Sequence, residues 1–104
     1  MKVLIAVPDR DLLKAYESLL TLCGHEPTAV FDGIQTVSAA ANTRFDVLIL
    51  DDKIPRVSAE RLLGLFTESK TPVILLSKGA FNTDKLKQYP SCELLRYPFL
   101  PAEL

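Results

Sequence analysis

Short apolar runs alternate with longer amphipathic stretches along the whole chain. Runs of this length and composition are typical of strands that are covered on both faces. They predict strands at Lys2–Val7, Pro27–Phe31, Phe45–Leu50, Val73–Leu76 and Glu93–Arg96. In the stretches between them, apolar residues recur at helical spacing, which predicts helices at 12–23, Ile34–Asn42, 59–66 and, more weakly, Thr83–Gln88.

Capping residues indicate where these helices begin and end. Asp9 or Asp11 is suited to cap the first helix, and Gly24 to end it in the left-handed conformation. Ser58 is suited to cap the third helix. Pro101 begins one more helix, but the sequence stops about one turn later at 3.6 residues per turn. The last helix is therefore predicted to be truncated or absent.

The alternation of strands and helices predicts βαβ units around a parallel sheet. Five such units predict one domain, residues 1–104, of the flavodoxin-like (βα)5 class, doubly wound with strand order 2-1-3-4-5. In such sheets, functional side chains lie at the carboxyl ends of the strands. The candidate site is therefore sought among the residues that follow each apolar run.

Composition excludes several classes of function. The formal net charge is −1, and the basic residues near the end of the chain are interleaved with acidic ones, so we expect no nucleic-acid or membrane binding. No apolar run approaches the roughly 18 residues of a membrane span. Cys23 and Cys92 lie far apart in the sequence, and we expect two reduced, mostly buried thiols in a cytoplasmic protein.

The strand ends carry the candidate chemistry. The first strand ends in Val7-Pro8-Asp9, and the chain has no glycine-rich phosphate loop, which argues against a flavin or nucleotide enzyme. The third ends in Asp51-Asp52, where a carboxylate could be a nucleophile, a metal ligand or a helix cap. The fourth ends in Ser77, whose hydroxyl could hold an oxyanion.

Several segments, in order along the chain, resemble one known family. They are MKVLIAVPDRDLL at the start, FDGIQTV, DVLILDDKIP, TPVILLS and LLRYPFLPAEL at the end. Each is a weak signal, but together they resemble the receiver domains of two-component response regulators over essentially the whole chain. The resemblance implies a signalling domain that is phosphorylated on an aspartate.

The resemblance also implies roles for individual positions. Asp51 falls on the phosphoacceptor, and Ser77 on the hydroxyl residue that holds the phosphoryl oxygens. The two acids that bind Mg²⁺ in the family fall on Val7 and Pro8, and its lysine falls on Tyr97. Because Mg²⁺ needs oxygen ligands, valine and proline side chains offer it nothing.

Two further departures from the receiver family also argue against phosphorylation chemistry. The aromatic residue that reports phosphorylation falls on Leu94, and Asp9 is a single acid shifted by one position. Because a metal and a cation normally neutralise the charge of phosphoryl transfer, their loss should reduce the chemistry to near background. We expect Lys53 or Arg10 to compensate the charge of Asp51 instead.

Two functions follow from these residues. The first is a pseudo-receiver, a phosphorylation-independent protein-interaction module with no enzymatic activity, no cofactor and no Mg²⁺ binding. The second is a genuine phosphoacceptor response regulator that uses Asp51 with divergent metal binding.

The missing last helix predicts an interaction surface. In a doubly wound sheet this helix packs beside the first, so its absence would leave apolar surface bare. We expect a protein partner or a second copy to cover it on the fourth-helix/fifth-strand side, through Leu94, Leu95, Phe99 and Leu100. The alternative is that the natural chain continues and supplies the helix itself.

Overall fold

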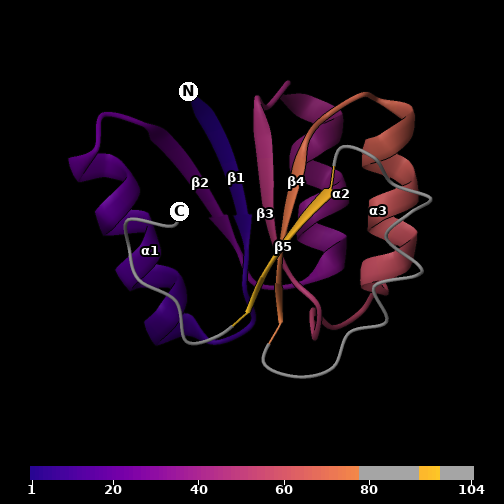
Figure 1. The fold of residues 1–104 in the computed structure, drawn as a ribbon, viewed down its shortest axis with the longest axis horizontal. Coiled ribbons are helices and arrows are strands. Elements are labelled where there is room, and N and C mark those ends of the chain that lie inside the picture. Colours follow the sequence, from indigo (N-terminus) through magenta and orange to yellow (C-terminus); the bar gives the residue numbers. More distant parts are fainter. Residues whose placement is uncertain (78–91, 97–104) are drawn as a thin grey trace.

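The computed structural model describes residues 1–77 and 92–96, the side chains of 93–96 excepted. Its elements alternate as expected (Figure 1). In chain order they are β1 (Lys2–Ala6), α1 (Arg10–Leu22), β2 (Glu26–Val30), α2 (Gly33–Asn42), β3 (Val47–Asp51), α3 (Ala59–Glu68), β4 (Val73–Ser77) and β5 (Cys92–Arg96). The predicted strands and helices in this part of the chain are confirmed, with ends that move by a residue or two.

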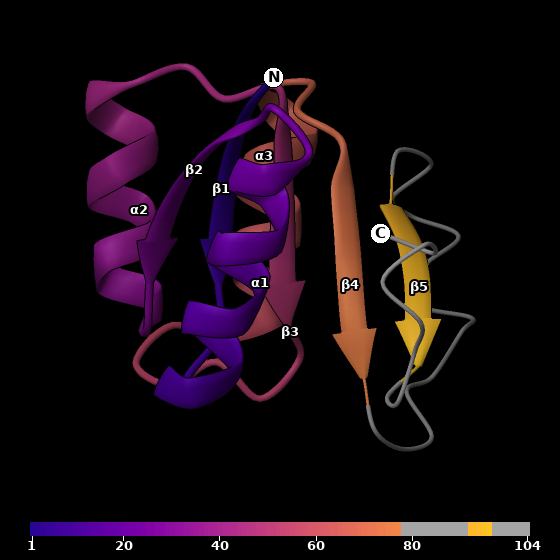
Figure 2. The same ribbon diagram turned by 90° about the vertical axis from the view of Figure 1, so that its left-hand side faces the viewer.

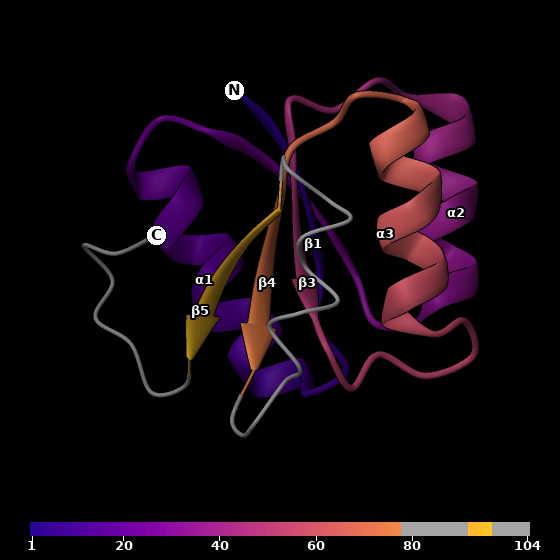
Figure 3. The ribbon, with the colours of Figure 1, turned by 45° about the vertical axis from the view of Figure 1, so that its right-hand side comes forward.

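The strands form one parallel sheet of order β2-β1-β3-β4-β5. In its centre, Ile49 of β3 pairs with Ile5 of β1 and Ile74 of β4. Helix α1 covers one face of the sheet, and α2 and α3 cover the other (Figures 2 and 3). The predicted doubly wound, flavodoxin-like architecture is therefore confirmed.

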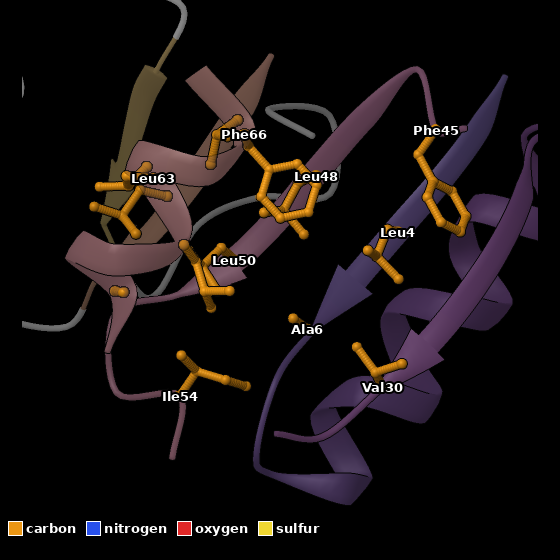
Figure 4. Packing of buried hydrophobic residues seen from close by; sticks show 13 residues of the cluster. Leu4, Ala6, Val30, Phe45, Leu48, Leu50, Ile54, Leu63 and Phe66 are labelled. Carbon is orange, nitrogen blue, oxygen red and sulfur yellow. The ribbon is translucent and has the colours of Figure 1, made fainter. Parts of the chain in front are cut away.

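Successive residues of each central strand enter two different cores, because side chains alternate between the faces of a sheet. Leu48 and Leu50 of β3 face α2 and α3, in a cluster that includes Leu63 and Phe66 of α3 (Figure 4). Ile49, between them, joins the cluster on the α1 side. All of these side chains are at least nine-tenths buried, so each contributes about 1.5–3 kcal/mol to stability.

The ends of α1 follow its capping residues. Asp9 is the N-cap, and its carboxylate accepts hydrogen bonds from the backbone N–H groups of Asp11 and Leu12. At the other end Gly24 has a φ of 86°, and its N–H donates to Thr21, as in a Schellman motif. The prediction that both thiols are mostly buried is wrong for Cys23, which is exposed at the C-cap of α1.

The loop after β3 packs on the start of α2. The Gly33 N–H donates to the Pro55 carbonyl at 2.8 Å, and a Cβ on Gly33 would meet the Val57 Cβ at 2.5 Å. Arg56, between these two loop residues, has a φ of 79°, a conformation that glycine adopts at no steric cost. Glycine at position 33 therefore lets the loop that follows β3 lie directly against α2.

Two predicted helices, Thr83–Gln88 and the short one that begins at Pro101, lie outside the described residues. Within the described residues, no helix is long and apolar enough to cross a membrane.

Replacement of Gly33 by alanine should destabilise the fold by about 1–3 kcal/mol, because the new methyl group overlaps Val57. Gly64→Ala is the matched control, since nothing lies within 4 Å of a Cβ at that helical position. It should instead stabilise the protein by about 0.5–1 kcal/mol. Denaturant unfolding of dilute protein measures both. Equal effects of the two changes would contradict the close packing of Gly33 on the loop.

Candidate functional site

The carboxyl ends of β1, β3 and β4 meet at one edge of the sheet, to which the arrowheads in Figure 2 point. Asp51 ends β3 and is 7% exposed, and Ser77 ends β4 and is 1% exposed. These are two of only three buried polar or charged residues in the described part of the chain, the third being Thr36 in α2. The edge is therefore a polar site at the end of an apolar sheet, where the sequence predicted it.

Asp51 is held by the turn that follows its own strand. Its Oδ1 accepts a hydrogen bond from the Lys53 backbone N–H at 2.8 Å, and its carbonyl accepts one from the Ile54 N–H at 3.1 Å. Ile54 is buried in the core on the side of α2 and α3. The turn is therefore anchored by an apolar side chain while its backbone fixes the carboxylate.

Ser77 is bonded to the acid next to Asp51. Its Oγ donates to Asp52 Oδ2 at 2.8 Å, and the Asp52 N–H donates to the carbonyl of Leu76 at 2.9 Å. Asp52 is thereby tied to the end of β4 by both its backbone and its side chain. The proton of the Ser77 hydroxyl points to Asp52 in this arrangement.

Tyr16 of α1 is electrostatically coupled to Asp51. Burial and, to a smaller extent, the Asp51 carboxylate raise the pKa of the Tyr16 phenol above its ordinary value of 10.0. The ring also packs against the core cluster on the α1 side. The phenol is therefore neutral at physiological pH.

The end of β1 offers few oxygen ligands. The Val7 side chain is completely buried in the cluster on the α1 side, and its N–H donates to the Val30 carbonyl at 3.1 Å. Pro8 is half-buried, and Asp9 uses its carboxylate to cap α1. Within residues 1–77 and 92–96, no group of three or more His, Cys, Asp or Glu is placed to hold a metal ion.

The two residues predicted to compensate the charge of Asp51 have other contacts. The Arg10 guanidinium lies over the Phe31 ring, 4.4 Å from its centroid, in a cation–π contact. Lys53 is exposed and reaches Asp51 through its backbone N–H. Compensation of Asp51 by either side chain stays a prediction.

The remaining predicted site residues are placed in part or not at all. Leu94 and Leu95 lie on β5, where they pair with Leu75 and Leu76 of β4. Tyr97, Phe99 and Leu100 lie outside the described residues, and the interaction surface predicted there stays a prediction.

Sequence reasoning missed the roles of Tyr16 and Asp52. Tyr16 fits the apolar stripe of α1 and gives no separate signal that its hydroxyl lies near Asp51. Asp52 was noticed as part of an acid pair, but its bond to Ser77 joins residues 25 positions apart. Only the adjacency of β3 and β4 creates that contact.

Known proteins are similar in sequence to this chain over nearly its whole length. No model of a known protein family matches the chain. Protein PilG of Pseudomonas aeruginosa is 26% identical over 110 residues, which span all of this chain and 82% of PilG. The transcriptional regulatory protein PrrA of Mycobacterium leprae is 28% identical, and the alignment covers 99% of this chain but only 46% of PrrA.

Solved structures give the same answer for the fold. The receiver domain of the Francisella response regulator 1452 superposes with a TM-score of 0.84 at 26% identity, over 98% of this chain and 88% of that one. The receiver domain of the sensor histidine kinase PA1611 from Pseudomonas aeruginosa, solved with a magnesium ion in its active-site cleft, has a TM-score of 0.84 at 25% identity over the same shares. The chain therefore has the receiver-domain fold and is similar in sequence to response-regulator receiver domains along its whole length.

Replacement of Asp51 by asparagine should lower the pKa of Tyr16 towards its ordinary value, because the negative charge that disfavours the phenolate is removed. The shift should be partial, since burial acts on Tyr16 first. Spectrophotometric titration of tyrosinate measures it, with Tyr16→Phe subtracted to remove the other two tyrosines.

The raised pKa of Tyr16 also determines how the stability of the fold changes at alkaline pH. The pKa of Tyr16 is raised by folding, so its contribution is complete below the unfolded value near 10 and is lost as the pH rises through the folded value. Tyr16→Phe should therefore weaken the alkaline loss of stability. An identical Tyr16 titration with and without the Asp51 charge would contradict the coupling.

Replacement of Ser77 by alanine should cost about 1–2 kcal/mol, because Asp52 loses a hydrogen bond from a buried hydroxyl. Asp52→Asn keeps an acceptor oxygen and should cost less. In a double-mutant cycle of Ser77→Ala with Asp52→Ala, the two losses should be clearly non-additive. Ser38→Ala, at an exposed position of α2, is the control and should change the free energy of unfolding little. Additive losses at Ser77 and Asp52 would mean that the bond contributes nothing.

Proposed function

We propose that this chain is a pseudo-receiver of the two-component type, which binds other proteins without being phosphorylated at Asp51. The single observation that carries the proposal is the end of β1. There Val7 belongs to the apolar core and Pro8 follows it, while Asp9 caps a helix. The resemblance to receivers places two magnesium-binding acids at these first two positions.

The chemistry of phosphoryl transfer supports this proposal. Transfer to a carboxylate gathers several negative oxygens beside Asp51, and that charge has to be neutralised as it develops. Mg²⁺ requires near-octahedral oxygen ligands, and the described donors around Asp51 do not fit such a shell. We therefore propose that the domain binds no Mg²⁺, needs no cofactor and has no enzymatic activity.

The backbone around Asp51 is compatible with a structural role. Its Oδ1 accepts a hydrogen bond from the Lys53 N–H, and its carbonyl accepts one from the Ile54 N–H. We propose that Asp51 orders the turn after β3.

The alternative function is a genuine phosphoacceptor that uses Asp51 with divergent metal binding. Two observations favour it: Asp51 is the last residue of β3, and Ser77 ends the neighbouring strand. The similar PA1611 receiver domain binds magnesium in its active-site cleft. Because Ser77 donates to Asp52, a phosphoryl group on Asp51 would have to compete for that hydroxyl or accept other donors.

The partner is proposed to be a protein, either a second copy or another component of a cytoplasmic signalling pathway. The formal net charge of −1 gives no field that would attract nucleic acid or a membrane surface. Many curated relatives are longer than this chain, which spans only about half of PrrA.

Incubation with a small-molecule phosphodonor and Mg²⁺ should leave the intact mass of the protein unchanged, because β1 supplies no carboxylates for the metal. The PA1611 receiver domain, which holds a magnesium ion in its active-site cleft, is the parallel control. A Pro8→Asp variant restores one of the missing acids at a half-buried position and should bind Mg²⁺ more tightly than the wild type, measured by amide shifts in NMR spectra. A gain of one phosphoryl mass by the wild type, lost in Asp51→Asn, would establish the alternative.

A further inference from the structure

The outward surface of α2 and α3 is apolar. Ile34 and Val37 of α2 are 54% and 39% exposed, and Leu65 of α3 is 47% exposed. Among the residues that the structure describes, the only other large hydrophobic side chains so exposed are Met1 and Leu22. The two helices stand side by side on one face of the sheet (Figure 3), and Val37 and Leu65 line one groove between them. The outward surface of the two helices is here called the α2–α3 face.

A groove runs between the two helices on this face. Its volume is about 240 Å³, and its lining is Val37, Ala40, Ala41, Leu65, Phe66 and Ser69. Helix α2 carries no charged residue along its entire length. An uncharged surface helix beside an exposed leucine is typical of a surface that is covered in an assembly.

The exposed stripe of α3 has opposite charges at its two ends. Arg61, Gly64, Leu65 and Glu68 follow the i, i+3, i+4, i+7 spacing that places residues on one side of a helix. Arg61 and Glu68 are exposed, and within the described part of the chain neither side chain has an ion-pair or hydrogen-bonding partner. A Cβ on Gly64 would point into open space. Along this side of α3, a cationic side chain is therefore followed by a glycine, an exposed leucine and an anionic side chain.

This order is self-complementary. When two copies of α3 pack antiparallel about a two-fold axis between positions 64 and 65, Arg61 of each copy faces Glu68 of the other. Leu65 of each copy then faces Gly64 of the other, where no side chain stands in its way. We infer that the α2–α3 face is the contact surface of a homodimer, in which a second copy of this chain is the occupant.

Helix α2 fits the same symmetry. An axis that pairs α3 with its copy also pairs α2 with its copy, because the two helices lie side by side on one surface. Its outward residues at the same spacing are Ile34, Val37, Ser38 and Ala41. With no charge on the helix, this pairing brings no like charges together.

The inference names a second copy of this chain as the partner of the proposed interaction module, and it rests on that proposal. The experiment nevertheless distinguishes a failure of the homodimer from a failure of the pseudo-receiver proposal. The association is measured without phosphodonor and without Mg²⁺, so its outcome does not depend on whether Asp51 can be phosphorylated.

Sedimentation velocity of the wild type from micromolar to near-millimolar concentration should show a monomer–dimer equilibrium. Arg61→Glu and Glu68→Arg each place like charges opposite one another twice, and each should raise the dissociation constant about tenfold. The double variant, which exchanges the two charges, should restore the wild-type value. Added salt should weaken the wild-type dimer.

Two further variants test the apolar contact. Leu65→Asp should abolish the dimer, whereas Leu22→Asp, at an 83% exposed position of α1, should leave it unchanged. Gly64→Ala should stabilise the monomer yet weaken the dimer, a combination that simple loss of folding cannot produce. A wild type that stays monomeric at every concentration overturns the inference, as does a dimer that resists Leu65→Asp or is not rescued by the charge exchange.

Discussion

Burial of both faces of the parallel sheet is the constraint on which the rest of this structure depends. Parallel strands are joined by crossover helices, so each central strand needs apolar side chains that point both ways. In β3, Leu48 and Leu50 meet α2 and α3 while Ile49 meets the α1 side. Polar side chains can then gather only where the strands end, and Asp51 and Ser77 lie there.

The same constraint shapes the end of β1. Val7 extends β1 by one backbone hydrogen bond and adds its side chain to the α1-side core, at a position where receiver domains carry an acid. Around Asp51, the backbone N–H groups of Lys53 and Ile54 fix the turn after β3, and the carboxylate contributes to the raised pKa of Tyr16.

Much of the fold was predictable because its signals are local. Apolar runs indicate strands, Ser58 and Asp9 cap helices, and Gly24 ends α1 in the left-handed conformation. The places of Asp51 and Ser77 at strand ends followed from the same patterns. The buried state assigned to Cys23 was wrong, because this residue is the C-cap of α1 and lies past the buried Leu20.

By itself, the sequence determined the order of elements, the class of sheet and the residue types at each strand end, since these depend on neighbours within a few positions. Only the tertiary structure decided which side chains meet. The bond from Ser77 to Asp52, the coupling of Tyr16 to Asp51 and the fit of Gly33 against Val57 all join different elements. Such contacts arise from the pairing of strands and the docking of helices, and no local pattern along the chain records them.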